Sequence, residues 1–411
     1  MEFKQYPSYK PSGVEWLGDV PEHWQIVRTK DIFNHRKEEA LEDDEIVTAF
    51  RDGQVTLRKN RRTDGFTNSI KEHGYQHINS GDLVIHEMDA FAGAIGVSDS
   101  SGKSTPVYSV CYAKNENINH HFYSHFFRTM AKTGFINSLA KGIRVRSTEF
   151  RWNESRNVYL VEPPKSDQQK IVAFLDTETT RIDNLIAKQE KLIELLEEQR
   201  KSIISHAVTK GLNPNAPMKD SGVEWLGDVP NHWKIGRLKN LLSINNGSDY
   251  KEFEVENSEN SYPVYGSGGV FTYSSKYIYD QESVLLGRKG TINKPLYVTS
   301  PFWAVDTMFY SQVKQGVHGK YVYYQALGFP YDRYSSNTAL PSMTQTDLLN
   351  LSVTIPSISE QIEITQFLDN EIAKFDNLIS KQKKLIEKLK EYRSSIISHA
   401  VTGKIDVREF C

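Results

Sequence analysis

The feature that most constrains the fold is a long segment that the chain contains twice. Its first copy covers residues 166–210. The tetrapeptide DNLI begins at Asp183 and again at Asp376, and the octapeptide SIISHAVT begins at Ser202 and again at Ser395, so both motifs recur at a spacing of 193 residues. Two segments this similar should adopt the same structure.

Apolar residues in both copies alternate at spacings of three and four, which is the period of a coiled coil. Polar residues interrupt the two seams at matched places, Gln189 in the first and Gln382 in the second. A polar residue inside an apolar seam costs stability but can specify register. The predicted coiled-coil seam is formed by Ile171, Leu175, Ile182, Leu185, Gln189, Leu192 and Leu196 in the first copy and by Leu368, Phe375, Leu378, Gln382, Leu385 and Leu389 in the second.

Each copy has the residues that commonly start and stop a helix. Pro163 and Pro164 precede Ser166, whose hydroxyl can cap free amide groups, and Pro356 precedes Ser359 in the same way. A helix of this length spans roughly 60 Å. The alternative is an ordinary amphipathic core helix, but such helices rarely exceed about 20 residues. We therefore predict two long helices that pair with each other.

A second repeat stands before each half of the chain. SGVEWLGDVPEHW occupies residues 12–24 and SGVEWLGDVPNHW occupies residues 221–233, and we call these the two Trp segments. The chain is thus a tandem duplication in which a Trp segment and a variable body precede each long helix. We predict a first domain at 1–162, a long helix at 163–210, a linker at 211–220, a second domain at 221–355, a long helix at 356–403 and a tail at 404–411.

Both bodies show one pattern of short apolar runs separated by Gly- and Ser-rich turns, which predicts α+β domains. Each has three early strands, a helix and a last strand before the prolines. The aromatic face of the first helix is more typical of a core than of a base-stacking platform. The expected strands are 82–86, 94–97, 107–113 and 158–161, then 283–286, 295–298, 305–313 and 351–355, and the helices are 121–139 and 320–327.

Charge excludes a protein that grips nucleic acid by bulk attraction. The net charge is −2, residues 28–162 carry 19 Lys/Arg against 18 Asp/Glu, and residues 237–355 carry 10 of each. Only Cys111 and Cys411 are present, so no disulfide framework is expected. The sequence has neither a signal peptide at its start nor an apolar stretch long enough to span a membrane. A cytoplasmic location without membrane contact is therefore expected.

Catalytic signatures are absent apart from near misses. Gly102-Lys103-Ser104 lacks the earlier glycine of a P-loop, and the His pairs 73/77 and 121/125 have no third ligand nearby in sequence. We expect no metal site, no cofactor in this chain and no catalysis by it. Two rival readings stay open at this point: an enzyme with divergent nuclease or methyltransferase motifs, and a coiled-coil tether with two peptide-binding domains.

Donor-rich clusters inside the bodies are the candidate DNA contacts. Arg and Lys can bind guanine edges and phosphates, and Asn and Gln can read adenine. For any single residue a solvated surface role is the alternative. The predicted contacts are Arg51, Arg58, Lys59, Arg61, Arg62, Lys141, Arg144 and Arg146 in the first body and Ser267, Arg288, Lys289 and Asn337 in the second.

Taken together, the chain resembles a specificity (S) subunit of a Type I DNA restriction–modification system over nearly its whole length. The resemblance rests on the duplicated Trp segments, on the FLD…DNLI helices and on their SIISHAVT ends. GDLVIHEMDAFAGAIGV at 81–97 and YPVYGSGGVFTYSSKYIYD…VLLGRKGT at 262–291 add phrases that look like target recognition domains.

This resemblance implies two target recognition domains held apart by an antiparallel pair of helices with approximate two-fold symmetry. Each domain would read one half of a split, asymmetric site in double-stranded DNA. The helices would set the spacer and dock two adenine-N6 methyltransferase subunits, while restriction/translocase subunits complete the complex. S-adenosylmethionine, ATP and Mg²⁺ would be used by those partners. An antiparallel pairing would also bring Gln189 close to Gln382, where they would hold the register.

Overall fold

A computed structural model describes residues 3–61, 73–139, 150–334 and 341–410. The chain divides into two compact units. Unit 1 comprises Met1–Lys188 together with Leu385–Cys411, and unit 2 comprises Gln189–Lys384. The division cuts both long helices, α5 (Lys165–Lys210) and α9 (Ile358–Val401). Each unit therefore contains one body and parts of both long helices.

Unit 1 is an α+β unit whose strands are all short. Its strands are β1 (Tyr9–Pro11), β2 (Asp19–Pro21), β3 (Gln25–Arg28), β4 (Phe33–His35), β5 (Val47–Ala49), β6 (Val55–Leu57), β7 (Gln76–Ile78), β8 (Leu83–His86), β9 (Ile95–Val97), β10 (Gly102–Ser104), β11 (Tyr108–Ala113) and β12 (Tyr159–Glu162). Its helices besides α5 and α9 are α1 (Thr29–Ile32), η1 (Arg58–Asn60), η2 (Ala90–Ala92), α2 (His120–Lys132), α3 (Phe135–Ser138) and α4 (Trp152–Ser155).

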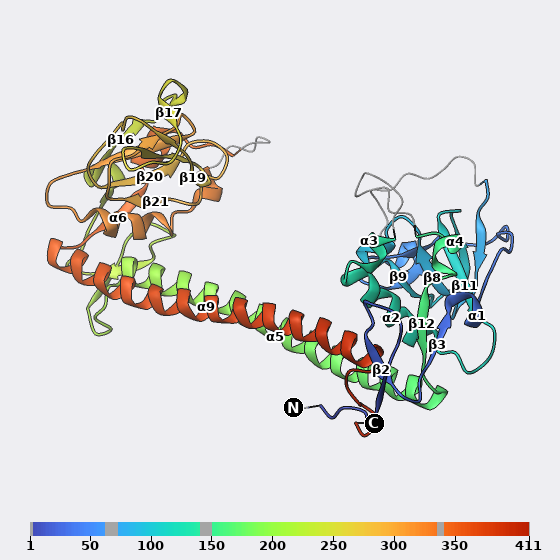
Figure 1. Cartoon of the computed structure of the whole chain (residues 1–411). Helices are drawn as coiled ribbons and strands as arrows, with labels where there is room; N and C mark the ends of the chain where they lie inside the picture. The colour runs from blue at the N-terminus through green and yellow to red at the C-terminus, as the bar shows by residue number, and fades with distance from the viewer. Residues whose placement is uncertain (1–2, 62–72, 140–149, 335–340, 411) are drawn as a thin grey trace. The chain divides into compact units, whose positions relative to one another are not determined.

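A four-stranded antiparallel sheet in the order β4-β11-β8-β9 carries the core of unit 1. Helix α2 covers it and lies between the sheet and the helix pair (Figure 1). The side chains of Phe122, Phe126, Phe127 and Met130 on α2 are fully buried. The prediction that this aromatic face belongs to the core is confirmed. Its burial removes a large apolar area from water, which is the main stabilising term.

Unit 2 repeats this plan and adds a second sheet. Its strands are β13 (Met218–Asp220), β14 (Asp228–Pro230), β15 (Lys234–Arg237), β16 (Leu242–Asn246), β17 (Glu254–Val255), β18 (Tyr262–Gly266), β19 (Gly269–Ser274), β20 (Ser283–Gly287), β21 (Leu296–Val298), β22 (Trp303–Ala304), β23 (Met308–Val313) and β24 (Ser352–Ile355). Its short helices are η4 (Leu238–Asn240), η5 (Lys251–Phe253), α6 (Gly319–Ala326), α7 (Tyr331–Tyr334) and α8 (Gln345–Leu349).

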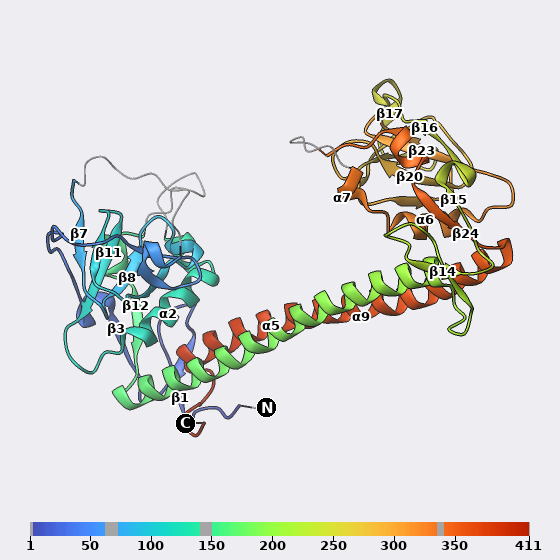
Figure 2. The ribbon, with the colours of Figure 1, turned by 180° about the vertical axis from the view of Figure 1, so that it is seen from behind.

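The sheet β16-β23-β20-β21 has the same strand order as the core sheet of unit 1. The last strand pairs with an early one in both units, β12 with β3 and β24 with β15, and leads directly into a long helix (Figure 2). The second sheet, β17-β19-β18-β22, occurs in unit 2. In unit 1 the hairpin β5–β6 stands at the corresponding stage of the chain. The duplicated α+β fold is as predicted, and the units differ in what is inserted after the first sheet strand.

Segments of α5 and α9 run antiparallel within each unit. In unit 1 the Arg393 guanidinium binds the Asp183 carboxylate through two contacts of 2.8 and 3.1 Å. In unit 2 Arg200 lies 3.6 Å from Asp376. Buried apolar residues of both helices share one core cluster in each unit, among them Ile182 and Ile396 in unit 1 and Ile204 and Ile364 in unit 2.

The seam differs in part from the heptad prediction. Ile171, Leu175, Ile182, Leu196 and Leu368 are buried, and Leu185, Phe375 and Leu389 are half-buried. Leu192, Leu378 and Leu385 are instead about two-fifths exposed, at 39%, 42% and 40%. Ile379 and Ile386, one residue further on, are buried in their place. The reason is geometric, because a straight helix with 3.6 residues per turn drifts by about 20° per heptad away from a strict seven-residue seam.

The two glutamines do not meet as expected. Both side chains are half-buried, and among the described residues no hydrogen bond joins Gln189 to Gln382. Counting along the helices from Arg200 and Asp376 places Gln382 opposite Glu194, five residues beyond Gln189. That offset corresponds to about 7.5 Å along a helix, which is too far for a direct contact.

The segments predicted as linker and tail are both structured. Residues 218–220 of the linker form β13, which pairs with β14 of the second Trp segment. Ile405 and Val407 of the tail are buried in the core of unit 1, and the Asp406 amide donates to the Lys4 carbonyl oxygen. Both segments follow a helix end that packs on a Trp segment, so their backbones continue along a surface that is already formed.

Candidate nucleic-acid interface

The Trp segment of each unit is bonded to the start of a long helix. In unit 1 the Asp167 carboxylate accepts hydrogen bonds from His23 Nε2 at 2.9 Å and from Trp24 Nε1 at 3.4 Å. In unit 2 Glu360 accepts from His232 Nε2 at 2.7 Å and from Trp233 Nε1 at 3.0 Å. We call these contacts the His-Trp locks. They explain why His and Trp end both copies of the segment.

The helix starts differ from the expected caps. Helix α5 begins at Lys165 with Pro164 accepting the first amide bonds, so Ser166 is not its cap. Helix α9 begins after Ser357 rather than Ser359, and the Ser357 hydroxyl and the Glu360 carboxylate cap each other's amides. Burial alone would raise the pKa of Glu360, but bonds from His232, Trp233 and Ser357 outweigh it and lower that pKa to about 2.

A second pair of contacts holds the core helix of each unit to a long helix. The Gln168 amide oxygen accepts from the Asn119 backbone N–H at 2.8 Å, and its amide group donates to the Pro163 carbonyl oxygen. Gln361 makes the same two contacts, with the His318 N–H at 2.9 Å and with the Pro356 carbonyl oxygen. Gln168 and Gln361 are almost fully buried. Each body is thus fixed to a helix end at two separate points.

Each Trp segment also contacts the C-terminal end of a long helix from the other half of the duplication. The end of α9 contacts the first Trp segment, and the end of α5 contacts the second. Lys404 Nζ donates to the Leu17 and Asp19 carbonyl oxygens in unit 1, and Lys210 Nζ donates to the Asp228 carbonyl oxygen in unit 2. A Cβ on Gly403 would lie 3.0 Å from the Trp24 ring, and one on Gly211 would lie 3.1 Å from the Trp233 ring. Both glycines have positive φ, so the helix end and the close approach each favour glycine.

In unit 1 the predicted DNA contacts gather on the hairpin β5–β6 and on η1 after it. Arg51 is 67% exposed and is paired with Asp89 at 2.9 Å. Arg61 is paired with Asp52 at 2.7 Å and lies over the Phe50 ring. Arg58 Nε donates to the Thr48 hydroxyl at 3.4 Å, and Lys59 pairs with Glu45. These exposed pairs are worth little in stability, so exchange for another anion would cost little.

In unit 2 Arg288 and Lys289 line an open cleft of about 320 Å³. Asn246 at the end of β16 and Gln345 at the start of α8 contribute side-chain amides to the lining, Ser342 and Thr344 contribute hydroxyls, and Phe309 and Met343 form an apolar wall. Backbone bonds hold the Arg288–Lys289 turn in place, since both amides donate to the Thr307 carbonyl oxygen. The cleft combines a guanidinium, an ammonium and two amides, which is the donor and acceptor set that can read base edges.

Sequence reasoning located part of this cleft and missed the rest. Ser267 lies beside it, since a Cβ on Gly290 would be 3.4 Å from the Ser267 hydroxyl. Asn246 and Gln345 were not predicted, although their side chains are hydrogen-bonded to each other at 3.3 Å. A signal was present in Asn245-Asn246-Gly247, where two polar residues end β16 and a glycine follows it. A Cβ on Gly247 would lie 2.1 Å from the Val305 carbonyl oxygen, so this position requires glycine.

Five predicted contacts lie outside the described residues. They are Arg62, Lys141, Arg144, Arg146 and Asn337.

The near misses for catalysis have structural roles in the described part of the chain. Residues 102–104 form β10, which pairs with β7, and so do not form a phosphate-binding loop. His77 is bonded to Asp44 at 2.7 Å and to Asn79 at 3.2 Å. Among the described residues no group of three His, Cys, Asp or Glu side chains is arranged to hold a metal ion. None of the described helices is long and apolar enough to cross a membrane.

Comparisons with known proteins agree with this architecture. The chain is 22% identical to the MjaVIII Type I restriction enzyme specificity subunit of Methanocaldococcus jannaschii, over 95% of this chain and 94% of that protein. It is 28% identical to the EcoprrI specificity subunit of Escherichia coli over 35% of each chain. The first relative thus matches nearly the whole chain, and the second matches one part of it.

Solved structures show the same fold. A chain from a structure described as the basis of complex assembly and conformational transition of the type I R-M system superposes with a TM-score of 0.72 at 15% identity, covering 93% of this chain and 98% of that one. The HsdS subunit of Thermoanaerobacter tengcongensis superposes with a TM-score of 0.56 at 16% identity, covering 94% and 98%. The Type I restriction modification DNA specificity domain family matches residues 21–197 and 230–391, most of the chain and both copies of the duplication. The chain therefore belongs to the family of Type I restriction–modification DNA specificity subunits.

Proposed function

We propose that this chain reads a split, asymmetric DNA target with its two bodies and docks two adenine-N6 methyltransferase subunits and the restriction subunits of the complex. The observation that carries the proposal is that the two bodies have core sheets of the same strand order but present different hydrogen-bond donors. Unit 1 offers arginines on a hairpin, and unit 2 offers Arg288, Lys289, Asn246 and Gln345 around a cleft. Identical bodies would favour a symmetric site, whereas different ones favour two different half-sites.

Exposed apolar side chains on the long helices support the docking role. In unit 2, Leu192 and Leu195 on α5 are 39% and 46% exposed, and Phe367 and Leu378 on α9 are 39% and 42% exposed. Contiguous exposed apolar surface commonly marks an interaction site, and these side chains on α5 and α9 would contribute to one. The partner subunits would supply the chemistry with S-adenosylmethionine, ATP and Mg²⁺, while this chain uses no cofactor of its own.

The test is to express the chain with its methyltransferase subunit in a methylation-free host and to map N6-methyladenine at single-base resolution. We expect a split motif that appears only when this chain is present. The double variant Arg288→Ala/Lys289→Ala should weaken or relax the motif at one half and leave the other half intact. Lys294→Ala removes an exposed cation from the same unit and is the matched control.

Two outcomes would contradict the proposal. One is the same methylation pattern with and without the chain. The other is an equal loss at both halves in the cleft variant, which would indicate a general phosphate contact instead of base reading.

The spacer function of the helices has its own test. Matched insertions within residues 182–196 of α5 and 375–389 of α9 should lengthen the unspecified spacer and leave the half-sites unaltered. An insertion of whole turns keeps the buried face in phase, which lets the helices continue to pair. Altered half-sites with constant spacing would remove this role.

A further inference from the structure

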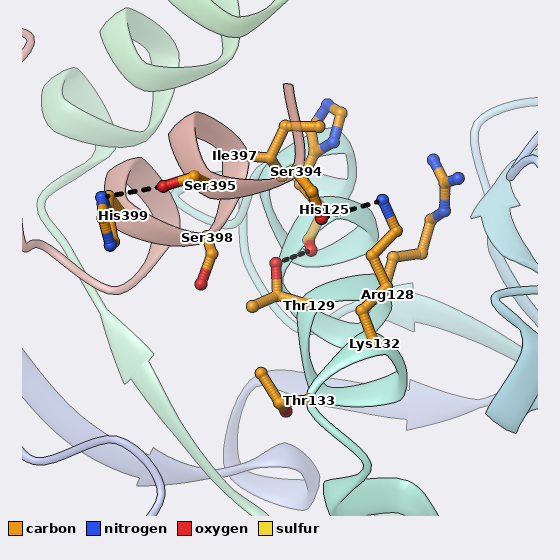
Figure 3. Close-up of a pocket in the computed structure, with 10 residues that line it drawn as sticks. All are labelled: His125, Arg128, Thr129, Lys132, Thr133, Ser394, Ser395, Ile397, Ser398 and His399. Atoms are coloured by element: carbon orange, nitrogen blue, oxygen red, sulfur yellow. Dashed lines mark hydrogen bonds between the residues drawn. The ribbon is translucent and has the colours of Figure 1, made fainter. Parts of the chain in front are cut away.

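A cationic pocket of about 230 Å³ lies in unit 1 between α2 and the C-terminal part of α9 (Figure 3). His125, Arg128 and Lys132 line it from one face of α2, spaced three and four residues apart. Serine hydroxyls line the opposite wall from α9, at Ser394, Ser395 and Ser398. Guanidinium, ammonium and hydroxyl groups are all hydrogen-bond donors, and none of the lining residues is acidic.

The side-chain nitrogen atoms of this pocket have few partners. Arg128 Nε and His125 Nδ1 are buried and make no hydrogen bond within the described residues. Lys132 Nζ donates a long hydrogen bond of 3.5 Å to the Ser394 hydroxyl, which Figure 3 draws. Buried donors are nearly always paired in folded proteins, and an unpaired buried cation is costly. Such a group calls for an occupant.

Electrostatics point to the sign of the occupant. Burial lowers the pKa of Arg128, nearby Arg393 lowers it further, and the charge of Asp52, which lies outside the pocket lining, offsets only part of this lowering. Burial and the charges of Arg128 and Arg393 lower the pKa of Lys132 in the same way. Burial lowers the pKa of His125 to about 4, so this imidazole is neutral at pH 7. A bound anion would offset the repulsion between these cations, and no carboxylate of the lining does so.

The neighbouring hairpin indicates which anion fits. The Arg128 guanidinium packs on the turn after β5, where a Cβ on Gly53 would lie 2.3 Å from Arg128 Nη1 and φ is +95°. The same turn carries Arg51 and is followed by Arg61, which are predicted DNA contacts. The pocket thus continues the cationic hairpin surface onto α2 and α9.

We propose that the Arg128–Lys132 pocket binds a phosphate of the DNA backbone and positions the duplex against unit 1. This inference rests on the proposed DNA-reading function. Phosphate contacts set the position and orientation of a protein on DNA but carry no sequence information. The pocket therefore fixes where the hairpin of unit 1 meets the bases.

Unit 2 offers no equivalent among its described residues. Asn119 and His318 correspond, since each is bonded to the equivalent glutamine of a long helix. Counting on from them places Tyr324 at the position of His125 and Leu327 at that of Arg128. The Tyr324 hydroxyl is bonded to Asp369, so this junction is satisfied internally. The phosphate site is a property of one half of the duplication.

The experiment uses the complex of this chain with its methyltransferase subunit and a DNA duplex that carries the mapped target. It measures how the binding constant of the complex for the duplex falls as the salt concentration rises. Loss of one phosphate contact should reduce the slope of log K against log salt by about 0.9. We expect this reduction for Arg128→Gln and for Lys132→Gln, with the methylated motif unchanged. Lys4→Gln removes an exposed cation paired with Glu409 and should leave the slope unchanged.

A second measurement uses the free chain. Removing an unpaired buried cation should raise the melting temperature of Arg128→Met in the absence of DNA, although its DNA binding weakens. Inorganic phosphate should stabilise the wild-type chain and have little effect on Arg128→Met. A purely structural arginine would instead lower the melting temperature when replaced, and that result would overturn the proposal.

The remaining outcomes separate the possible sources of the anion. An unchanged salt slope in both glutamine variants overturns the proposal, even where inorganic phosphate binds. Weaker capture of the methyltransferase subunit with an unchanged slope also overturns it and assigns the pocket to a partner carboxylate. If the wild-type complex shows no sequence preference at all, the proposed function fails, and that result is distinct from a failure of the pocket alone.

Discussion

The two units meet their long helices through the same locks but differ at the core helix beside them. In unit 2 the Asp369 carboxylate accepts bonds from Lys320 and Tyr324 of α6. The corresponding Asp176 of unit 1 is exposed, and α2 presents Arg128 and Lys132 with no carboxylate in their pocket. In unit 2 the charged groups of the junction are paired with each other. In unit 1 the cations of the junction line a pocket without a carboxylate.

This difference shows which parts of a duplicated protein stay constant. Contacts that attach a body to a helix, such as Trp24 and Trp233, are repeated because both copies must bury the same surface. The charges where the core helix meets the long helix are not repeated, since Asp369 is paired in unit 2 and Arg128 and Lys132 line a pocket in unit 1. Four comparisons test this reading.

The largest expected effect concerns the Trp segments. Trp24 and Trp233 are 0% and 2% exposed, so Trp24→Ala and Trp233→Ala should each cost about 3–5 kcal/mol of unfolding free energy in their own unit. Hydrogen exchange within each unit would measure it. Leu41→Ala, at a side chain that is 62% exposed, is the control and should change little. A loss confined to one of the two tryptophans would break the equivalence of the segments.

The next effect is the pH dependence of the lock in unit 2. The folded pKa of Glu360 is about 2, below its ordinary 4.5, so its contribution is complete above pH 4.5 and is lost as pH falls towards 2. We expect about 1–3 kcal/mol from this group after allowance for solvent screening. The unfolding free energy of unit 2, measured by denaturation at several pH values between 6 and 2, should fall by this amount. Glu360→Gln should flatten that profile, whereas Glu363→Gln, at an exposed position on the same helix, should not.

A smaller effect should separate the two aspartates at the junctions. Asp369→Ala removes the acceptor of Lys320 and Tyr324 and should cost about 1–2 kcal/mol. Asp176→Ala at the matching exposed position should stay within about 0.5 kcal/mol. Urea denaturation of both variants measures the pair. Equal losses of unfolding free energy would mean that Asp369 and Asp176 contribute equally and that the two junctions do not differ in their hydrogen bonding.

The smallest effect concerns the ion pairs between α5 and α9. Asp183→Asn breaks a two-contact pair with Arg393, and Asp376→Asn breaks a single contact of 3.6 Å with Arg200. Both aspartates are more than half exposed, so we expect at most about 0.5–1 kcal/mol for the first and almost nothing for the second. Double-mutant cycles with Arg393→Gln and Arg200→Gln would measure both couplings, and a larger value for Arg200 would reverse the expected order.

Much of the fold could be predicted because the periodic patterns are strong. The strands expected at 82–86 and 283–286 are β8 and β20, and the expected helices include α2 and α6. The seam was less predictable. Leu192 and Leu378 satisfy a seven-residue pattern but face solvent, since burial depends on how far the real helices drift from that repeat.

The candidate site was predictable only in its charged members. Arg288 and Lys289 are adjacent in sequence, so their cluster is visible there. Asn246 and Gln345 come from distant segments, and only the packing of α8 beside β16 brings them together. The pocket of Arg128 likewise needs α9, which follows more than 200 residues later in the chain.

The sequence alone determined that this chain is a duplication of a Trp segment, an α+β body and a long helix, because repeats and apolar periodicity are local properties. The tertiary structure decided that Asp167 and Glu360 accept the His-Trp locks and that the last helix closes the first unit. It also decided that Arg128 lies beside serines in a pocket that no carboxylate lines. Burial and hydrogen bonding are properties of residues brought together from afar, and no local pattern contains them.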